Sequence, residues 1–175
     1  MRTTFDETKY MKIPCAITGK LVLDTDRERI RQKMAIFLTE EKGYLIADLV
    51  TDLKIPIEID GITMVSEVDL TVIIDERPMM IIRGGPGSVI TREAGTVAAA
   101  RLLFPDHIVP WAVQANLFDA SFLNVKTKKK VAYGWDAIPT RAELIKLAEK
   151  WPPPQLPESR IPLERQILYS YDTHG

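Results

Sequence analysis

A run of four apolar residues, Met79-Met80-Ile81-Ile82, places the strongest constraint on how this chain folds. Side chains of a strand alternate between two faces, so a run without any polar position predicts a strand that is covered on both sides. Such strands occur at the centre of sheets that carry helices on both faces. The run therefore predicts an α/β fold with a central buried strand.

The preceding segment, 63–74, alternates between apolar and polar residues, which predicts a half-buried strand. Its apolar face consists of Val68, Leu70, Val72 and Ile74. Its polar face carries Glu67, Asp69 and Thr71, and a solvated strand surface is the simplest interpretation of these residues. Asp60-Gly61 is a strong turn signal and predicts a hairpin with another strand over 53–59.

Helix signals occur at four places. Thr25 and Glu28 have capping-box spacing and open a helix that Gly43 ends, with the Glu28 side chain expected to bond back to the cap. A second helix is predicted over 91–103, and Thr140 with Glu143 opens a third. A short helix is expected after Ser159, with its apolar face formed by Leu163, Ile167 and Leu168.

The order of elements is helix, three strands, helix, further strands over 108–113, 121–125 and 130–133, and helix. A mixed sheet flanked by helices fits this order. We expect one α/β domain over residues 1–150. Residues 151–175 are expected to form a Pro-rich C-terminal tail that packs on the domain or trails from it, and that begins with Trp151-Pro152-Pro153-Pro154.

Composition limits the chemistry of the chain. One cysteine and two histidines exclude an internal disulfide and a structural zinc site, so any metal would be a hard ion held by carboxylates. No apolar run approaches the roughly 20 residues that span a bilayer, and the first ten residues do not resemble a signal peptide. We therefore expect a cytoplasmic protein without a membrane role. The net charge of −1 argues mildly against tight, non-specific nucleic-acid binding.

The buried strand ends in Arg83-Gly84-Gly85-Pro86-Gly87-Ser88, and Arg92 lies near the start of the next helix. One hypothesis is a phosphate site formed by Arg83, Gly84, Gly85, Ser88 and Arg92, in which backbone amides and the helix start converge on an anion. The alternative is a tight turn with Arg83 paired to a neighbouring acid such as Asp69.

A basic hairpin turn is predicted between the strands 121–125 and 130–133. It carries four lysines: Lys126, Lys128, Lys129 and Lys130. Such a run is usually a solvated turn, and the alternative is a contact with nucleic-acid phosphates.

Several segments in this order resemble the restriction-endonuclease-like fold of the PD-(D/E)XK superfamily, and in particular the N-terminal domain of type I restriction enzyme R subunits. The opening helix with Gly43-Tyr44, the strand Glu67-Val68-Asp69-Leu70, and the later segments Ala112–Asn116 and Gly134–Pro139 carry the resemblance. It covers roughly residues 20–150. Members cut DNA with an Asp and a Glu that hold Mg²⁺, and a Lys two residues after the Glu.

The resemblance implies a broken catalytic motif. Aligned on the apolar strand, Arg83 stands in place of the Glu and Gly85 in place of the Lys. A cation does not ligate Mg²⁺, and glycine has no side chain. Asp69, with Glu67 and Glu28, would be the remnant acidic site, and Asp69 would be the metal ligand if a metal binds.

Three functions remain open at this point. The first is a DNA-associated nuclease-fold module that has lost its activity and needs no cofactor. The second is an active Mg²⁺-dependent endonuclease whose catalytic residues have migrated, with Glu93 and Glu58 as candidates. The third is an assembly module that does not bind nucleic acid. Restriction-modification subunits or a second copy of the chain are the partners that the resemblance suggests.

Overall fold

A computed structural model describes residues 11–149 and 154–174. Its centre is a six-stranded mixed sheet in the order β3-β4-β5-β6-β7-β8. The strands are β3 (Leu49–Ile59), β4 (Ile62–Ile74), β5 (Arg77–Gly84), β6 (Trp111–Ala115), β7 (Ala120–Asn124) and β8 (Lys129–Tyr133). Only β5 and β6 are parallel, and the other neighbours are antiparallel. The predicted mixed sheet is therefore confirmed, with Met79–Ile82 inside its buried β5 strand.

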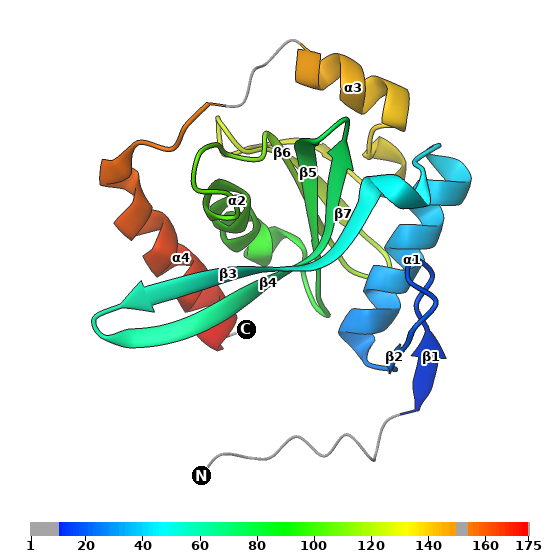
Figure 1. The fold of residues 1–175 in the computed structure, drawn as a ribbon, viewed down its shortest axis with the longest axis horizontal. Coiled ribbons are helices and arrows are strands. Elements are labelled where there is room, and N and C mark those ends of the chain that lie inside the picture. Colours follow the sequence, from blue (N-terminus) through cyan, green and yellow to red (C-terminus); the bar gives the residue numbers. More distant parts are fainter. Residues whose placement is uncertain (1–10, 150–153, 175) are drawn as a thin grey trace.

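Helices cover both faces of this sheet (Figure 1). Helix α1 (Asp26–Glu41) and α3 (Arg141–Glu149) pack on one face, whereas α2 (Glu93–Leu102) and α4 (Ile161–His174) lie on the other. Helix α2 is the crossover that joins the parallel strands β5 and β6. A small hairpin, β1 (Lys12–Pro14) with β2 (Leu21–Leu23), precedes α1. None of the helices in the described ranges has the length and apolar character needed to cross a bilayer.

Two threonines begin the helices that the capping patterns predicted. The Thr140 hydroxyl accepts the Glu143 amide N–H at 3.3 Å, and the Glu143 carboxylate accepts the Thr140 amide N–H at 2.8 Å. This reciprocal capping box is confirmed. At α1 the Thr25 hydroxyl accepts the Glu28 amide, but the Glu28 carboxylate bonds Arg31 and Gln32 instead of returning to the cap. The second half of that predicted box is therefore wrong.

The β3–β4 hairpin continues beyond the sheet as a two-stranded arm. Strand β4 pairs with β5 only from Leu70 onward, and residues 53–59 and 62–69 extend past β5 toward α4 (Figure 1). Asp52 has a φ of 59° in the middle of β3, and the hairpin twists there. As a result Leu70 packs in the core under α1, whereas Val68 packs with the helices on the opposite face. The prediction of one common apolar face was wrong for Val68.

Helix α4 is fixed to the body of the protein by a buried carboxylate. Glu164 is fully buried, and its Oε1 accepts bonds from Arg101 Nη1 at 2.7 Å and from Lys128 Nζ at 2.8 Å. Leu168 on the same helix is also fully buried, which confirms the predicted helix. Leu163 is exposed, however, so the expected apolar face was partly wrong. Helix α4 thus belongs to the folded core.

Because α4 depends on this ion pair, we predict that Glu164→Ala lowers the free energy of unfolding by about 3 kcal/mol, since it leaves the buried Arg101 charge without a counter-ion. Urea denaturation of both proteins measures the difference. Arg165→Ala, an exposed position on the same helix, is the matched control and should stay within about 0.5 kcal/mol of the parent. Equal stability of the two variants would contradict an anchoring role for Glu164.

Candidate functional site

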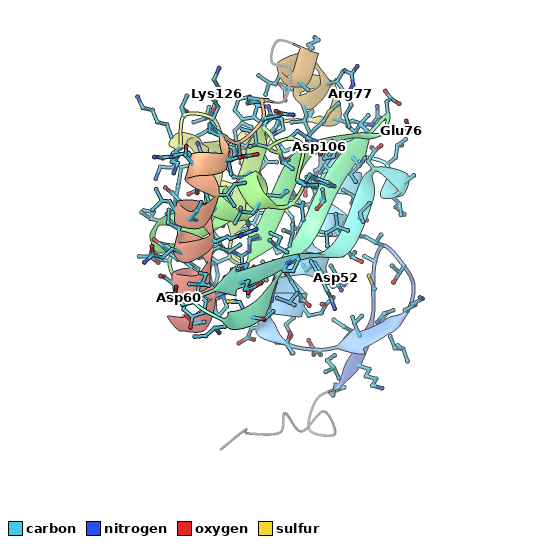
Figure 2. All side chains as sticks on the ribbon, turned by 60° about the vertical axis from the view of Figure 1, so that its left-hand side comes forward. Asp52, Asp60, Glu76, Arg77, Asp106 and Lys126 are labelled. Atoms are coloured by element: carbon cyan, nitrogen blue, oxygen red, sulfur yellow. The ribbon has the colours of Figure 1, made fainter. Side chains whose placement is uncertain are left out.

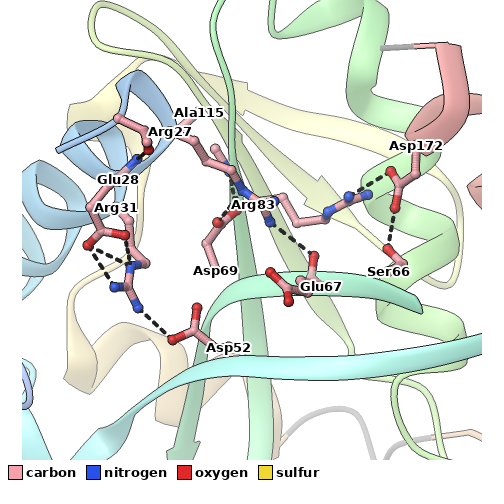
Figure 3. A network of polar contacts seen from close by, with 12 residues as sticks. Arg27, Glu28, Arg31, Asp52, Ser66, Glu67, Asp69, Arg83, Ala115 and Asp172 are labelled. Atoms are coloured by element: carbon pink, nitrogen blue, oxygen red, sulfur yellow. Dashed lines mark hydrogen bonds and ion pairs between the residues drawn. The ribbon is translucent and has the colours of Figure 1, made fainter. Parts of the chain in front are cut away.

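A groove of about 490 Å³ lies where the β3–β4 arm separates from β5. Its lining residues come from α1, β4, β5, the following loop and α4: Arg27, Ser66, Glu67, Arg83, Gly84, Gly85, Arg92, Tyr171 and Asp172. Three arginines and two acids therefore surround one opening. Figure 3 shows the polar contacts that connect these walls.

Asp69 lies at the point where the sheet divides. Its Oδ1 accepts the Arg27 Nε–H at 2.7 Å, and its Oδ2 accepts the Gly84 amide N–H at 2.8 Å (Figure 3). Leu70 and Ile82 form the last regular pair between β4 and β5. The Asp69 carboxylate therefore accepts the Gly84 amide N–H at a position where β4 no longer pairs with β5. Asp69 is only 4% exposed, so the predicted solvated face was wrong at this residue. Burial raises the pKa of the Asp69 carboxyl, and the Arg27 charge opposes this shift.

Arg83 is paired with α4 and not with Asp69. Its Nη2 donates to Asp172 Oδ1 at 2.8 Å, and the Ser66 hydroxyl donates to the other Asp172 oxygen (Figure 3). The Arg83 and Asp172 side chains are 14% and 16% exposed. Arg83 is thus held by an acid, as the structural alternative proposed, but the acid is Asp172. Asp69 instead receives its guanidinium from Arg27.

The other two acids of the predicted remnant site have separate roles. Glu28 bonds Arg31, which also donates to Asp52 at 3.0 Å. Glu67 has a half-exposed side chain, 3.9 Å from Lys54 Nζ, and its backbone carbonyl lies 3.5 Å from Arg27 Nη2. Figure 3 shows the Glu28 cluster beside the Asp69 pair. The acids are neighbours, yet each is already neutralised by its own cation.

Close packing and main-chain bonding account for the two glycines at the end of β5, Gly84 and Gly85. A Cβ on Gly84 would lie 2.7 Å from the Ile30 side chain, and one on Gly85 would lie 3.2 Å from Arg92 Nη1. The Gly84 amide donates to Asp69 and the Gly85 amide donates to the Ala115 carbonyl at 3.1 Å. These two amides are therefore engaged within the protein. Ser88 is exposed and lies outside the lining of the groove.

Arg92 differs from the other arginines of the groove. Its guanidinium lies over Gly85, and within the described part of the chain it forms no hydrogen bond or ion pair. Its backbone carbonyl lies 3.3 Å from Thr96 Oγ1 at the start of α2. The sequence hypothesis singled out both Arg83 and Arg92, and the structure brings them to the same groove. Among the described residues Arg92 therefore has no acid partner, in contrast to Arg27 and Arg83.

The lysine turn lies at the other end of the sheet. Gly84 pairs with Ala115, whereas the turn follows Asn124, which pairs with Trp111. Figure 2 shows Lys126 at the end of the molecule that also holds Arg77 and Asp106, away from Asp60.

Acids pair with Lys128 and Lys130 of this turn. Lys128 bonds the buried Glu164, and Lys130 lies 3.2 Å from Glu93. Lys126 and Lys129 are exposed. The structure therefore does not join the lysines to the arginine groove.

The residues of this groove do not fit Mg²⁺. Both Asp69 oxygens already accept hydrogen bonds, and the charges of Arg27 and Arg83 act on this carboxylate where a metal ion would need further acidic ligands. Within residues 11–149 and 154–174 no three acid, histidine or cysteine side chains gather as a metal would need. The candidate replacements Glu93 and Glu58 are not among the groove residues, and Glu93 accepts the Ser121 hydroxyl at 2.6 Å.

Sequence reasoning missed Arg27, Ser66 and Asp172. Arg27 sits in the first turn of a predicted helix among several charged residues, and nothing distinguished it from its exposed neighbours. Asp172 lies 89 residues from Arg83 in the sequence. The only available signal was charge balance, because a largely buried arginine requires an acid from some part of the chain.

The role of Asp69 gives a stability prediction. Asp69→Asn retains an acceptor for the Gly84 amide, whereas Asp69→Leu leaves that N–H unpaired. We expect the free energy of unfolding of the Leu variant to be about 1–3 kcal/mol lower than that of the Asn variant. Urea denaturation of both variants measures this difference. Similar stabilities would show that the bond to Gly84 contributes little.

Asp69 also predicts a pH dependence. Because its pKa is raised in the folded protein above the ordinary 3.8, the folded state binds a proton more readily than the unfolded state. The destabilisation from the buried charge is therefore present above the folded pKa and is relieved as pH falls through it. The stability of the parent relative to Asp69→Asn should rise on acidification, as parallel denaturation curves would measure. A fall in relative stability would contradict the raised pKa.

Comparison with known proteins identifies one family. The family model of the type I restriction enzyme R protein N terminus (HSDR_N) matches residues 26–139, which is more than half of the chain and includes α1 and the sheet. Comparisons with curated proteins and with solved structures find no match. The match contains Asp69, Arg83 and Arg92, whereas Asp172 lies outside it. The chain belongs to the family of type I restriction enzyme R protein N-terminal domains.

Proposed function

We propose that this chain is a nuclease-fold module that binds DNA phosphates through the arginine groove and does not cut them. The observation that carries the proposal is the state of Asp69: the acid that would hold Mg²⁺ in this family's chemistry is bonded to Arg27 and to the Gly84 amide. The position where the resemblance puts the second metal ligand carries Arg83. A guanidinium does not ligate Mg²⁺, whereas its N–H groups bind phosphate oxygens.

The charge of the groove supports a DNA partner of modest affinity. Arg27 and Arg83 are each paired to one acid, and Arg92 is free to contact a phosphate. The near-neutral net charge gives the rest of the protein little attraction for DNA. Binding through two or three phosphate contacts is therefore expected, and it should weaken steeply as salt is raised.

We predict that Arg92→Ala weakens binding to a short DNA duplex about tenfold at about 50 mM salt, and reduces the steepness of the salt dependence by about one phosphate contact. Fluorescence anisotropy over a salt series measures both quantities. The double variant Lys126→Ala/Lys129→Ala, at the other end of the sheet, should have a smaller effect. A larger loss of DNA affinity in the lysine variant would place the DNA-binding surface at the lysine turn and contradict binding by the groove.

We also predict that the purified protein leaves plasmid DNA intact in Mg²⁺ or Mn²⁺, because the carboxylate needed for the metal is occupied. Gel electrophoresis after prolonged incubation tests this. Metal-dependent cleavage that disappears in Asp69→Ala would contradict the proposal and favour an active endonuclease with migrated residues.

An assembly role is the second candidate, and exposed apolar residues favour it. Phe118 is 84% exposed in the β6–β7 turn, and Tyr133 and Val131 are exposed on β8, an edge strand of the sheet. Exposed apolar side chains at a sheet edge are typical of contacts between proteins. Partner subunits of a restriction-modification system, or a second copy of the chain, would suit this edge. Analytical ultracentrifugation of the parent and Phe118→Ser would reveal self-association there.

A further inference from the structure

A small cavity of about 30 Å³ adjoins the groove and shares several of its residues. Arg83, Arg92, Gln114, Gly95 and Tyr171 line it, together with Gly84 and Asp172. Its size corresponds to two or three water molecules at about 10–15 Å³ for each water centre. A nucleoside does not fit into this space, but a single phosphoryl group does.

The cavity is lined mostly by hydrogen-bond donors. Within the described residues no hydrogen bond or ion pair engages the Arg92 guanidinium, and Arg83 donates one N–H to Asp172 and retains others. The Asp172 carboxylate is the single acid of the lining, and both its oxygens are already used by Arg83 and Ser66. An incoming group must therefore supply acceptors.

Gln114 adds an oriented donor to this set. It is only 3% exposed, and the Thr96 hydroxyl donates to its Oε1 at 2.5 Å. This bond fixes the amide so that Nε2 carries the free hydrogens, and Nε2 has only one long contact, 3.4 Å, to the Ala115 carbonyl. A buried amide with unused N–H capacity points to a ligand that accepts hydrogen bonds.

We propose that this cavity binds the terminal phosphate monoester of a nucleic-acid strand that lies in the groove. A phosphate within a strand carries two ester-linked sugars, so the cavity would need two openings for the chain to pass through. A terminal phosphate carries one sugar and needs only the opening toward the groove. The monoester also carries the larger negative charge and three free oxygens, which match the donors of Arg92, Arg83 and Gln114. This inference rests on the proposed function and specifies its ligand as a phosphorylated DNA end.

The experiment compares a short DNA duplex carrying 5′-phosphates with the same duplex carrying 5′-hydroxyls, by anisotropy at about 50 mM salt. The parent should bind the phosphorylated DNA about tenfold more tightly, the ratio that one charge-assisted hydrogen bond provides. Gln114→Glu keeps the acceptor for Thr96 but presents a carboxylate to the cavity. It should abolish the preference while binding of the hydroxylated DNA persists. Arg165→Ala, an exposed position on α4, is the control and should retain the preference.

Each outcome separates the two proposals. Equal affinity of the parent for both duplexes, or a preference that survives in Gln114→Glu with its fold intact by circular dichroism, overturns the terminal-phosphate site and leaves DNA binding by the groove in place. No binding of either duplex overturns both. Arg92→Lys adds a second variant that keeps the charge: a reduced preference there supports the cavity, and an unchanged preference contradicts the role of the guanidinium.

Discussion

The division of the sheet depends on one carboxylate. Asp69 bonds Arg27 of α1 with one oxygen and the amide of Gly84 in β5 with the other, so it joins a helix to a strand where the regular ladder stops. Without this acceptor the Gly84 amide would have no partner on the β4 side of β5, where the pairing with β4 has already ended. The arm, the groove and the placement of Arg83 all follow from this separation. A residue type associated with metal chemistry in this family therefore has a structural role here.

The sequence predicted the order of the elements because the information is local. Period-2 alternation, capping threonines and the Asp60-Gly61 turn each act within a few residues, and the elements of the structure agree with them. The twist at Asp52 was not predictable, because an aspartate with positive φ leaves no mark in the hydrophobic pattern. The pairs that define the site join residues 42 and 89 positions apart. Such pairs arise from tertiary contacts, and sequence spacing carries no record of them.

The charge arrangement explains how a buried polar site persists without a bound ion. Three ion pairs lie between α1, β4, β5 and α4, and each joins an acid to a guanidinium: Asp69 to Arg27, Asp172 to Arg83 and Glu28 to Arg31. Buried charges are tolerated when they are paired in this manner. No acid of the described residues pairs with Arg92, so its wall of the groove carries a positive charge without a counter-ion from that part of the chain.

Helix α4 lies beyond the segment that defines the family, yet it brings Asp172 to Arg83 and Glu164 to Arg101. It behaves like a ligand that is covalently tethered to its receptor. A tethered acid is present at a high and constant local concentration, whatever the ionic content of the cell. The acids that neutralise Arg83 and Arg101 are consequently part of the polypeptide itself, and their presence does not vary with the supply of magnesium.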